Sequence, residues 1–152
     1  MENQLVIFTL ENEQYGVDIR AVESIITMQN ITHMPHAPSF MEGVINLRGK
    51  ILPVIDLRQR FNLPYREVTR EARIVVVSMG SAEVGMVVDS VSEVLTFQDE
   101  DIEPTPALAV TNGSRLIAGI AKVAGQLVVL LDLAAVLSWH EVLALESLPI
   151  GV

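Results

Sequence analysis

The sequence predicts an all-β fold, in the form of small barrels or a sandwich. Short segments rich in Val, Ile and Leu follow one another closely, and Gly, Asn or charged pairs bound them. These segments do not alternate with helices in the rhythm that a parallel sheet requires. The same order of segments also occurs twice along the chain, so we expect two structurally similar units.

Two pairs of segments carry this repeat, each at its own constant offset. Residues 6–26 align with residues 75–95 at an offset of 69 positions, and residues 43–57 align with residues 119–133 at an offset of 76. Residue types agree at the fixed points of the alignment: Gly16 with Gly85, Val22 with Val91, Gly43 with Gly119, Gly49 with Gly125 and Asp56 with Asp132. Two constant offsets favour structural duplication, with a pseudo-twofold relation between the units, over chance similarity of strands.

Eight segments are expected to be strands because they combine β-branched residues with polar or glycine boundaries. They are Leu5–Leu10, Gln14–Ile19, Val44–Leu47, Lys50–Ile55, Arg73–Met79, Val84–Val88, Ile117–Val123 and Gln126–Leu131. Arg48–Gly49 and Ala124–Gly125 are expected to be the tight turns of two hairpins, since Gly adopts the positive φ that such turns need.

Helices are expected to be few and mostly short. Residues 38–42, with Pro and Ser at their start, predict one helical turn, and residues 57–61 predict another. The clear helix is C-terminal, over residues 133–146, where apolar residues recur at helical spacing and Asp132 stands as the N-cap.

A polar segment, residues 62–72, is the expected junction between the halves. We therefore place a first barrel at about residues 14–66 and a second at about residues 73–132. Net charge differs between the halves. Residues 1–70 contain seven Lys or Arg and eight Asp or Glu, whereas residues 71–152 contain three Lys or Arg and eleven Asp or Glu. The two halves are expected to meet different surroundings.

Composition excludes several classes of protein. Half of the 152 residues are apolar and mean hydropathy is +0.42, so a sizeable core can form, but no apolar run approaches the roughly 20 residues that span a bilayer. The net charge of −9 argues against nucleic-acid binding. The absence of Cys and of a basic N-terminal signal region fits a protein that stays in a reducing cytoplasm.

No residue pattern predicts catalysis or a cofactor. His33 and His36 flank a proline in a loop and cannot close a zinc site alone, and His140 lies on the apolar face of the expected last helix. The acidic run at residues 99–103 lacks the spacing of a calcium loop. The chain has neither a phosphate-binding glycine loop nor a nucleophile elbow, so we expect no enzymatic activity, no metal and no cofactor.

The repeat is most informative where it breaks. Arg48 precedes the glycine of one hairpin turn, whereas Ala124 serves at the equivalent place in the other. Glu23 likewise has the neutral Ser92 as its counterpart. These opposite charges are either two independent surface charges or a functional pair in which Glu23 orients the Arg48 guanidinium.

Four ordered blocks of this chain resemble the CheW family of chemosensory adaptors. They are FTLENEQYGVDIRAVESI at residues 8–25, GVINLRGKILPVIDLR at 43–58, GMVVDSVSEVL at 85–95 and GIAKVAGQLVVLLDL at 119–133. The resemblance covers most of the chain and implies one CheW-like domain over residues 1–152. It implies two five-stranded barrels similar to Src-homology-3 barrels, in pseudo-twofold arrangement, with short helices and a C-terminal helix.

The function that the resemblance implies is that of a noncatalytic scaffold adaptor. Such an adaptor couples the cytoplasmic tips of methyl-accepting chemoreceptors to the regulatory domain of the CheA histidine kinase, with which it can alternate in rings. The implied location is the cytoplasm, with recruitment to membrane-associated receptor arrays but no membrane insertion, and the isolated protein is expected to be a monomer. The alternatives are an adaptor of a related pathway for pili or surface motility, and a ligand-binding protein that uses the cleft between the barrels.

The resemblance also implies two groups of site residues. Arg48 and Glu23 fall on positions linked to receptor and kinase coupling in the family. The apolar receptor groove between the barrels would be lined by Val6, Ile19, Val22, Ile25 and Val91. Because Val22 and Val91 are repeat equivalents, a pseudo-twofold axis would place both near the junction of the barrels, where an amphipathic helical tip could bind.

Overall fold

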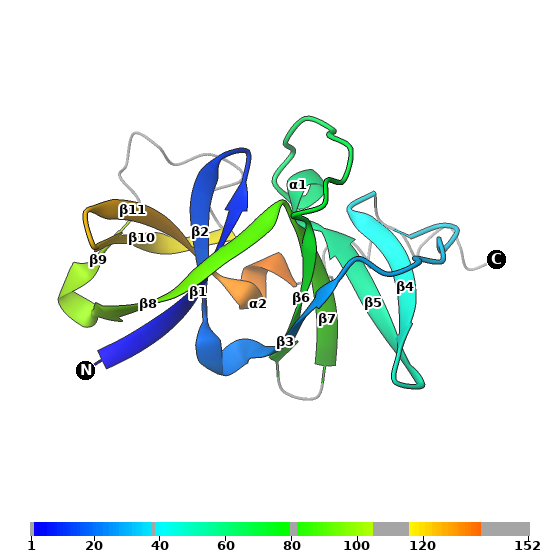
Figure 1. Cartoon of the computed structure of the whole chain (residues 1–152), viewed down its shortest axis with the longest axis horizontal. Helices are drawn as coiled ribbons and strands as arrows, with labels where there is room; N and C mark the ends of the chain where they lie inside the picture. The colour runs from blue at the N-terminus through cyan, green and yellow to red at the C-terminus, as the bar shows by residue number, and fades with distance from the viewer. Residues whose placement is uncertain (1, 38, 80–81, 105–115, 138–152) are drawn as a thin grey trace.

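Two β units lie side by side along the long axis of the molecule in the computed structural model (Figure 1). The structure describes residues 2–37, 39–79, 82–104 and 116–137. Short helical segments connect the strands, and no helix among these residues is long and apolar enough to cross a membrane. The predicted all-β class, with two similar units, is confirmed.

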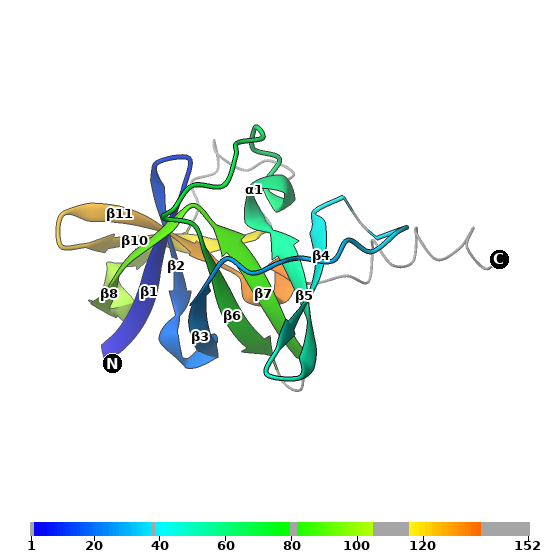
Figure 2. The same ribbon diagram turned by 45° about the vertical axis from the view of Figure 1, so that its right-hand side comes forward.

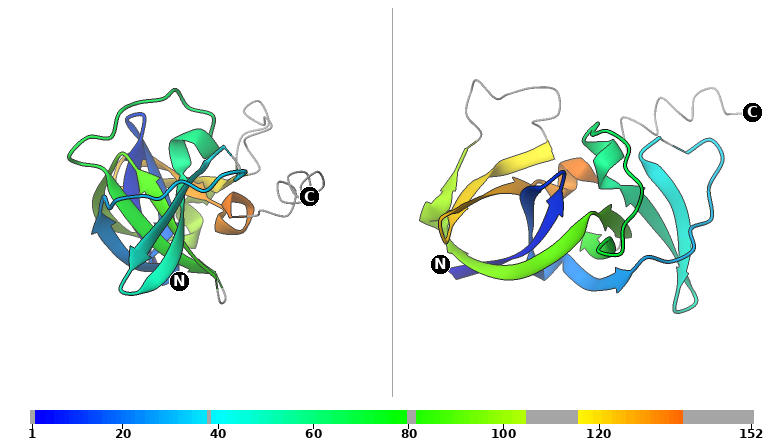
Figure 3. Two further views of the ribbon diagram at one scale, coloured as in Figure 1. Left: turned by 90° about the vertical axis from the view of Figure 1, so that its right-hand side faces the viewer. Right: turned by 45° about the horizontal axis from the view of Figure 1, so that its top comes forward.

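One unit, which we call the β1 barrel, is a six-stranded sheet in the order β8-β1-β2-β11-β10-β9. Its strands are β1 (Glu2–Leu10), β2 (Glu13–Asp18), β8 (Ser90–Gln98), β9 (Ile102–Glu103), β10 (Ile117–Val123) and β11 (Gln126–Leu131). All neighbours are antiparallel except β2 and β11, which run parallel. The strands curve around one another in the right-hand view of Figure 3.

The other unit, the β6 barrel, has five strands in the order β3-β6-β7-β5-β4, which stand side by side in Figure 2. Its strands are β3 (Val22–Thr27), β4 (Met41–Leu47), β5 (Lys50–Asp56), β6 (Arg73–Met79) and β7 (Ala82–Val88). Here β5 and β7 form the parallel pair. Among the described residues, four short helices accompany the strands: η1 (Ile19–Ala21), α1 (Leu57–Arg60), η2 (Asp99–Asp101) and α2 (Leu133–Val136).

The two repeats exchange their first hairpins. The β1–β2 hairpin leaves the strands that follow it and pairs with β8 and β11 of the second repeat, while β6 and β7 pair with β3 and β5 of the first. The division into a barrel at residues 14–66 and another at 73–132 is therefore wrong. Each barrel combines one hairpin from one repeat with the later strands of the other.

The pseudo-twofold relation holds in detail despite this exchange. The parallel contact of Leu130 with Gly16 repeats that of Val54 with Gly85, at the offsets that the sequence shows. Both glycines allow close approach: a Cβ on Gly85 would lie 2.7 Å from Ile74 Cγ2. The short helices α1 and α2 also occupy equivalent positions, each capped by an aspartate at its start.

Among the described residues, three apolar clusters explain the positions of the hairpins. One fills the β1 barrel and one fills the β6 barrel. The largest lies between the barrels, and we call it the seam; its buried residues are Val6, Phe8, Leu10, Val17, Phe40, Ile55, Leu57, Val75, Val77, Val84, Met86, Val88, Leu116, Leu131 and Val136. Strands β1 and β6 are buried on both faces, one toward a barrel and one toward the seam, and so they are continuous apolar runs.

Sequence reasoning differs from the structure at several elements. It missed β3 and β8, whose outward residues include Glu and Ser. The helical turn expected at residues 38–42 is wrong from Met41 onward, because β4 begins there. The short helix expected at 57–61 is confirmed by α1. The C-terminal helix starts at Leu133 as expected, but residues 138–146 lie outside the described residues.

Candidate functional site

The hairpin turn that carries Arg48 has the expected backbone. Arg48 and Gly49 have φ angles of 54° and 82°, and the equivalent Ala124 and Gly125 have 51° and 77°. The amide of Gly49 donates to Asn46 Oδ1 at 2.9 Å, which closes the turn. Since the two turns share one conformation, the arginine side chain is not needed for it and projects from the β6 barrel as an exposed group.

Arg48 and Glu23 lie on the wall of one surface hollow of about 270 Å³ at the end of the β6 barrel. The hollow is lined by Glu23, Ser24, Leu47, Arg48, Lys50, Val76 and Glu83. The ion pair in it joins Lys50 to Glu83, and the Glu83 carboxylate raises the pKa of Lys50, with a smaller contribution from Glu23. The structure thus brings Arg48 and Glu23 to one site, but no ion pair joins these two described side chains.

The four charges of this hollow are not repeated at the equivalent positions of the β1 barrel. The positions equivalent to Glu23, Arg48, Lys50 and Glu83 carry, in that order, Ser92, Ala124, Gln126 and Gln14. Sequence reasoning found two of these four differences and missed Lys50 and Glu83. The same two offsets would have identified them, because each is a charge whose repeat equivalent is a neutral amide.

Four expected groove residues form part of one surface above the seam. Ile19, Val22 and Val91 are partly buried against the seam, and Ile25 has 41% of its surface exposed. Val22 lies opposite Val77, and Val91 lies opposite Phe8, which is the repeat equivalent of Val77. Because cross-strand partners share a face of the sheet, Val22 and Val91 are on the seam side of their barrels.

Val6 and Val94 correct the membership of this surface. Val6 has only 2% of its surface exposed and belongs to the seam core, so its expected place at the groove edge is wrong. Val94 lies directly opposite Val6 and is 48% exposed. It is the repeat equivalent of Ile25 at the offset of 69, a signal that sequence reasoning did not use. We call Ile19, Val22, Ile25, Val91 and Val94 the seam surface.

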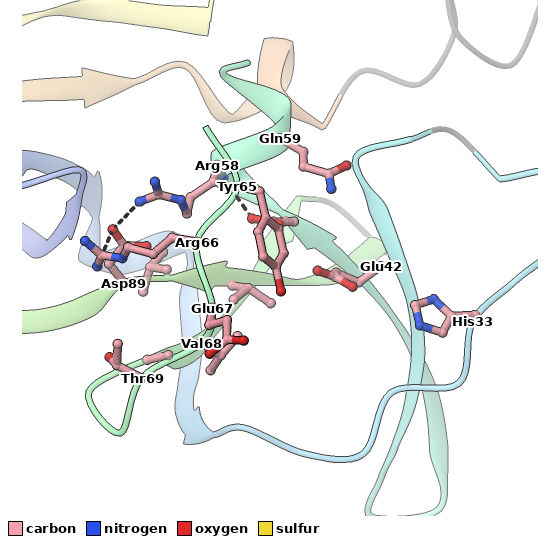
Figure 4. A pocket seen from close by; sticks show the side chains of 14 residues that line it. His33, Glu42, Arg58, Gln59, Tyr65, Arg66, Glu67, Val68, Thr69 and Asp89 are labelled. Atoms are coloured by element: carbon pink, nitrogen blue, oxygen red, sulfur yellow. Dashed lines mark hydrogen bonds and ion pairs between the residues drawn. The ribbon is translucent and has the colours of Figure 1, made fainter. Parts of the chain in front are cut away.

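Sequence reasoning also missed Arg58, the one buried charged residue among those that the structure describes. Its Nη1 donates to Asp89 Oδ2 at 2.7 Å, its Nη2 donates to Glu11 Oε2 at 2.8 Å, and the Pro64 carbonyl accepts from Nη2 at 2.8 Å. Arg66 adds a second cation at 3.1 Å from the same Asp89 oxygen (Figure 4). Burial alone would lower the pKa of Arg58, but the carboxylates of Glu11 and Asp89 outweigh this effect and raise the pKa above its ordinary value.

This arrangement, which we call the Arg58 clamp, joins three parts of the chain. Glu11 belongs to the β1–β2 turn, Asp89 links β7 to β8, and Pro64 belongs to the loop between α1 and β6. The repeat equivalent of Arg58 is Ala134, so the clamp is another break in the duplication. It ties the two barrels together on one side of the seam.

The fold and these surfaces define a double-barrel β protein with unlike polar ends and an apolar seam surface. The chain belongs to the CheW-like family, since the family model described as CheW-like domain matches residues 4–141. It is 36% identical to the chemotaxis protein CheW of Klebsiella aerogenes over 144 residues, which cover 95% of this chain and 87% of that relative. The chemotaxis protein CheW of Bacillus subtilis is also 36% identical, over 134 residues, with 88% and 86% covered.

A solved structure agrees with this placement. The scaffolding protein TtCheW from Thermoanaerobacter tengcongensis superposes with a TM-score of 0.81 at 38% identity, and the match covers 87% of this chain and 90% of that one. Both the duplicated barrel architecture and the family membership therefore stand on sequence and structure together. The chain is an adaptor of chemotaxis signalling.

Proposed function

We propose that the protein couples methyl-accepting chemoreceptors to the CheA histidine kinase and catalyses no reaction itself. The observation that carries this proposal is the unequal surface of two otherwise equivalent barrels. One barrel end has the charged hollow of Glu23, Arg48, Lys50 and Glu83, and the other has neutral residues at all four places. An adaptor within a mixed ring needs two different contacts, one on each side.

Each barrel end also offers an apolar anchor. Ile51 and Leu127 follow the equivalent hairpin turns and expose 66% and 64% of their surfaces. Arg48 and Lys50 flank Ile51, whereas Leu127 lies opposite Lys122, which pairs with Glu103. A large apolar side chain surrounded by polar groups has the composition of an interface anchor with its polar rim. We assign the two ends to two different faces of the kinase regulatory domain.

The seam surface is the proposed contact for the receptor tip. Val22 and Val91 supply its partly buried floor, and Ile25 and Val94 supply its exposed flanks. Two pseudo-equivalent pairs of apolar residues make a surface that an amphipathic helical hairpin can cover with apolar residues spaced three or four apart. On this proposal the protein works in the cytoplasm, as a monomer before assembly, and is recruited to receptor arrays at the membrane.

The test is a binding assay with two purified partners, a receptor cytoplasmic fragment and the CheA regulatory domain. Ile25→Asp and Val94→Asp should each lose receptor binding while thermal melting remains close to wild type, because a carboxylate at a half-exposed site stays hydrated. Val6→Asp is the matched control, since it buries an unpaired carboxylate opposite Val94 and should unfold the protein. Normal receptor binding by both seam-surface variants would refute the groove, and binding to neither partner by the wild type would refute the proposed function.

A further inference from the structure

Two carboxyl groups meet at the junction of β4 and α1. Glu42 lies on β4, and Asp56 ends the neighbouring strand β5 and caps α1, where its Oδ1 accepts the backbone N–H of Arg58 at 2.9 Å. Both side chains line the same pocket, and β4 and β5 are paired, with the Asp56 N–H donating to the Phe40 carbonyl at 2.7 Å just before β4 begins. Two carboxylates in one pocket repel each other, so a proton retained by one of them removes the repulsion and gives it an O–H group that can donate to the other.

The pair lies in a pocket of about 390 Å³ beneath the loop that follows α1. Figure 4 shows Glu42 on its wall near Tyr65, with His33 farther along. The charged and titratable groups that line it are His33, Glu42, Asp56, Arg58, Tyr65, Arg66, Glu67 and Asp89. The two arginines are already committed to other carboxylates, Arg58 to Glu11 and Asp89, and Arg66 to Asp89. Among the described groups of this pocket, no ion pair neutralises Glu42 or Asp56.

Electrostatics around the pair favours retention of a proton. Burial raises the pKa of Glu42, and the neighbouring Asp56 raises it further, against a small opposing effect of His33. Burial also raises the pKa of Asp56, although its hydrogen bonds to the backbone N–H groups of α1, the neighbouring Glu42 and the charge of Arg58 oppose this. Asp56 is thus the better anion of the two, because it caps the helix, and Glu42 is the better proton donor.

The duplicated half of the chain shows that this pairing is not needed for the fold. Asp132 caps α2 in the same way as Asp56 caps α1, but the residue equivalent to Glu42 is Ala118. A helix cap of this geometry therefore forms without a second carboxyl group beside it. Glu42 adds an acidic partner that a neutral residue could replace.

We propose that Glu42 and Asp56 share one proton in the folded protein and form a proton-dependent tie between β4 and the first turn of α1. The proton resides on Glu42, which donates to Asp56, while Asp56 remains the helix cap. Loss of the proton leaves two adjacent anions and removes the tie at the base of the helix that carries Arg58. The stability of the packing between β4 and α1 in the β6 barrel therefore depends on pH.

The direction of the pH effect follows from proton linkage. In the folded protein the pair holds a proton at pH values where an unfolded chain, with ordinary carboxyl pKa values near 4, has released it. Stability from the tie is therefore complete below about pH 4 and is lost as pH rises through the raised pKa of Glu42. For one linked proton the unfolding constant rises by at most about tenfold per pH unit in this window.

The experiment compares urea unfolding of the wild type, Glu42→Gln and Glu67→Gln between pH 4 and pH 8. Glutamine at position 42 donates to Asp56 at every pH, so the wild-type unfolding constant should rise with pH relative to that of Glu42→Gln. Glu67→Gln, a change on the same pocket wall at an exposed residue, should keep the wild-type profile. Parallel profiles for wild type and Glu42→Gln would overturn the proposal.

A carboxyl NMR titration of the wild type provides a readout that does not depend on how a variant folds. The Glu42 carboxyl carbon should titrate above the ordinary range, and the Asp56 carbon should respond to the same event because the two groups are coupled. Titration of Glu42 near pH 4, independent of Asp56, would exclude a shared proton. The transplant Ala118→Glu should create a second such pair with Asp132 and steepen the pH profile, and an unchanged profile would count against the pairing geometry.

Discussion

Removal of the Arg58 guanidinium tests the strongest electrostatic feature of the structure. We consider Arg58→Met, which keeps most of the apolar stem and removes the charge. The Arg58 side chain is 8% exposed, and its partners Asp89 and Glu11 are 10% and 40% exposed. Breaking a buried ion pair by removal of one partner destabilises by roughly 3–5 kcal/mol, chiefly because the other charge stays buried.

The structure places the expected loss at the lower end of that range. When Arg58 is lost, the half-exposed Glu11 carboxylate can be hydrated, so Asp89 is the main charge that stays buried without this partner. Asp89 keeps Arg66 at 3.1 Å and the Glu11 backbone N–H at 2.9 Å. The Pro64 carbonyl also loses its donor. We therefore expect Arg58→Met to lower the free energy of unfolding by about 3 kcal/mol.

Urea denaturation monitored by circular dichroism measures this loss. The matched control is Arg20→Ala, which removes an arginine from an exposed pair with Asp18 and should change stability little. Asp89→Asn combined with Arg58→Met should be less damaging than the sum of the single changes, since no stranded charge remains. A loss below about 1 kcal/mol for Arg58→Met, or strict additivity in the double variant, would refute the clamp as a buried electrostatic tie.

Two further predictions concern the barrel ends. Arg48→Ala and Glu23→Ala should each lower the free energy of unfolding by less than about 1 kcal/mol, and their effects should be additive in a double-mutant cycle because no ion pair joins the two residues in their hollow. Both variants should nevertheless weaken receptor–kinase assembly. Wild-type assembly by Arg48→Ala would exclude this site. Ile51→Asp and Leu127→Asp should impair different kinase contacts. The contact at Ile51, beside the four charged residues of the hollow, should weaken more with added salt than the contact at Leu127, which lies opposite the single cation Lys122. Equal salt dependence of both contacts in a binding titration would contradict the assignment.

Local features of this protein were largely readable in its sequence. Strands such as β6 and β11 combine β-branched residues with clear boundaries, and the Arg48–Gly49 turn follows from the freedom of glycine. Strands β3 and β8 were not recognised because both are bulged, at Glu23 and at Ser92. Each bulge shifts the alternation of apolar and polar residues that a two-residue period requires. The role of Asp132 as a helix cap followed from its position, whereas the same role of Asp56 before α1 was seen only in the structure.

Long-range placement was decided only by the tertiary structure. Duplication in the sequence determined that there would be two equivalent barrels, and residue types at the two offsets determined which positions would correspond. Local patterns are the same whether a hairpin pairs within its own repeat or crosses to the other, so they could not reveal the exchange of β1–β2 and β6–β7. Burial of both faces of β1 and β6 selects the crossed pairing. For the same reason the partners of Arg58, which lie 47 and 31 residues away at Glu11 and Asp89, became visible only once the barrels had been assembled.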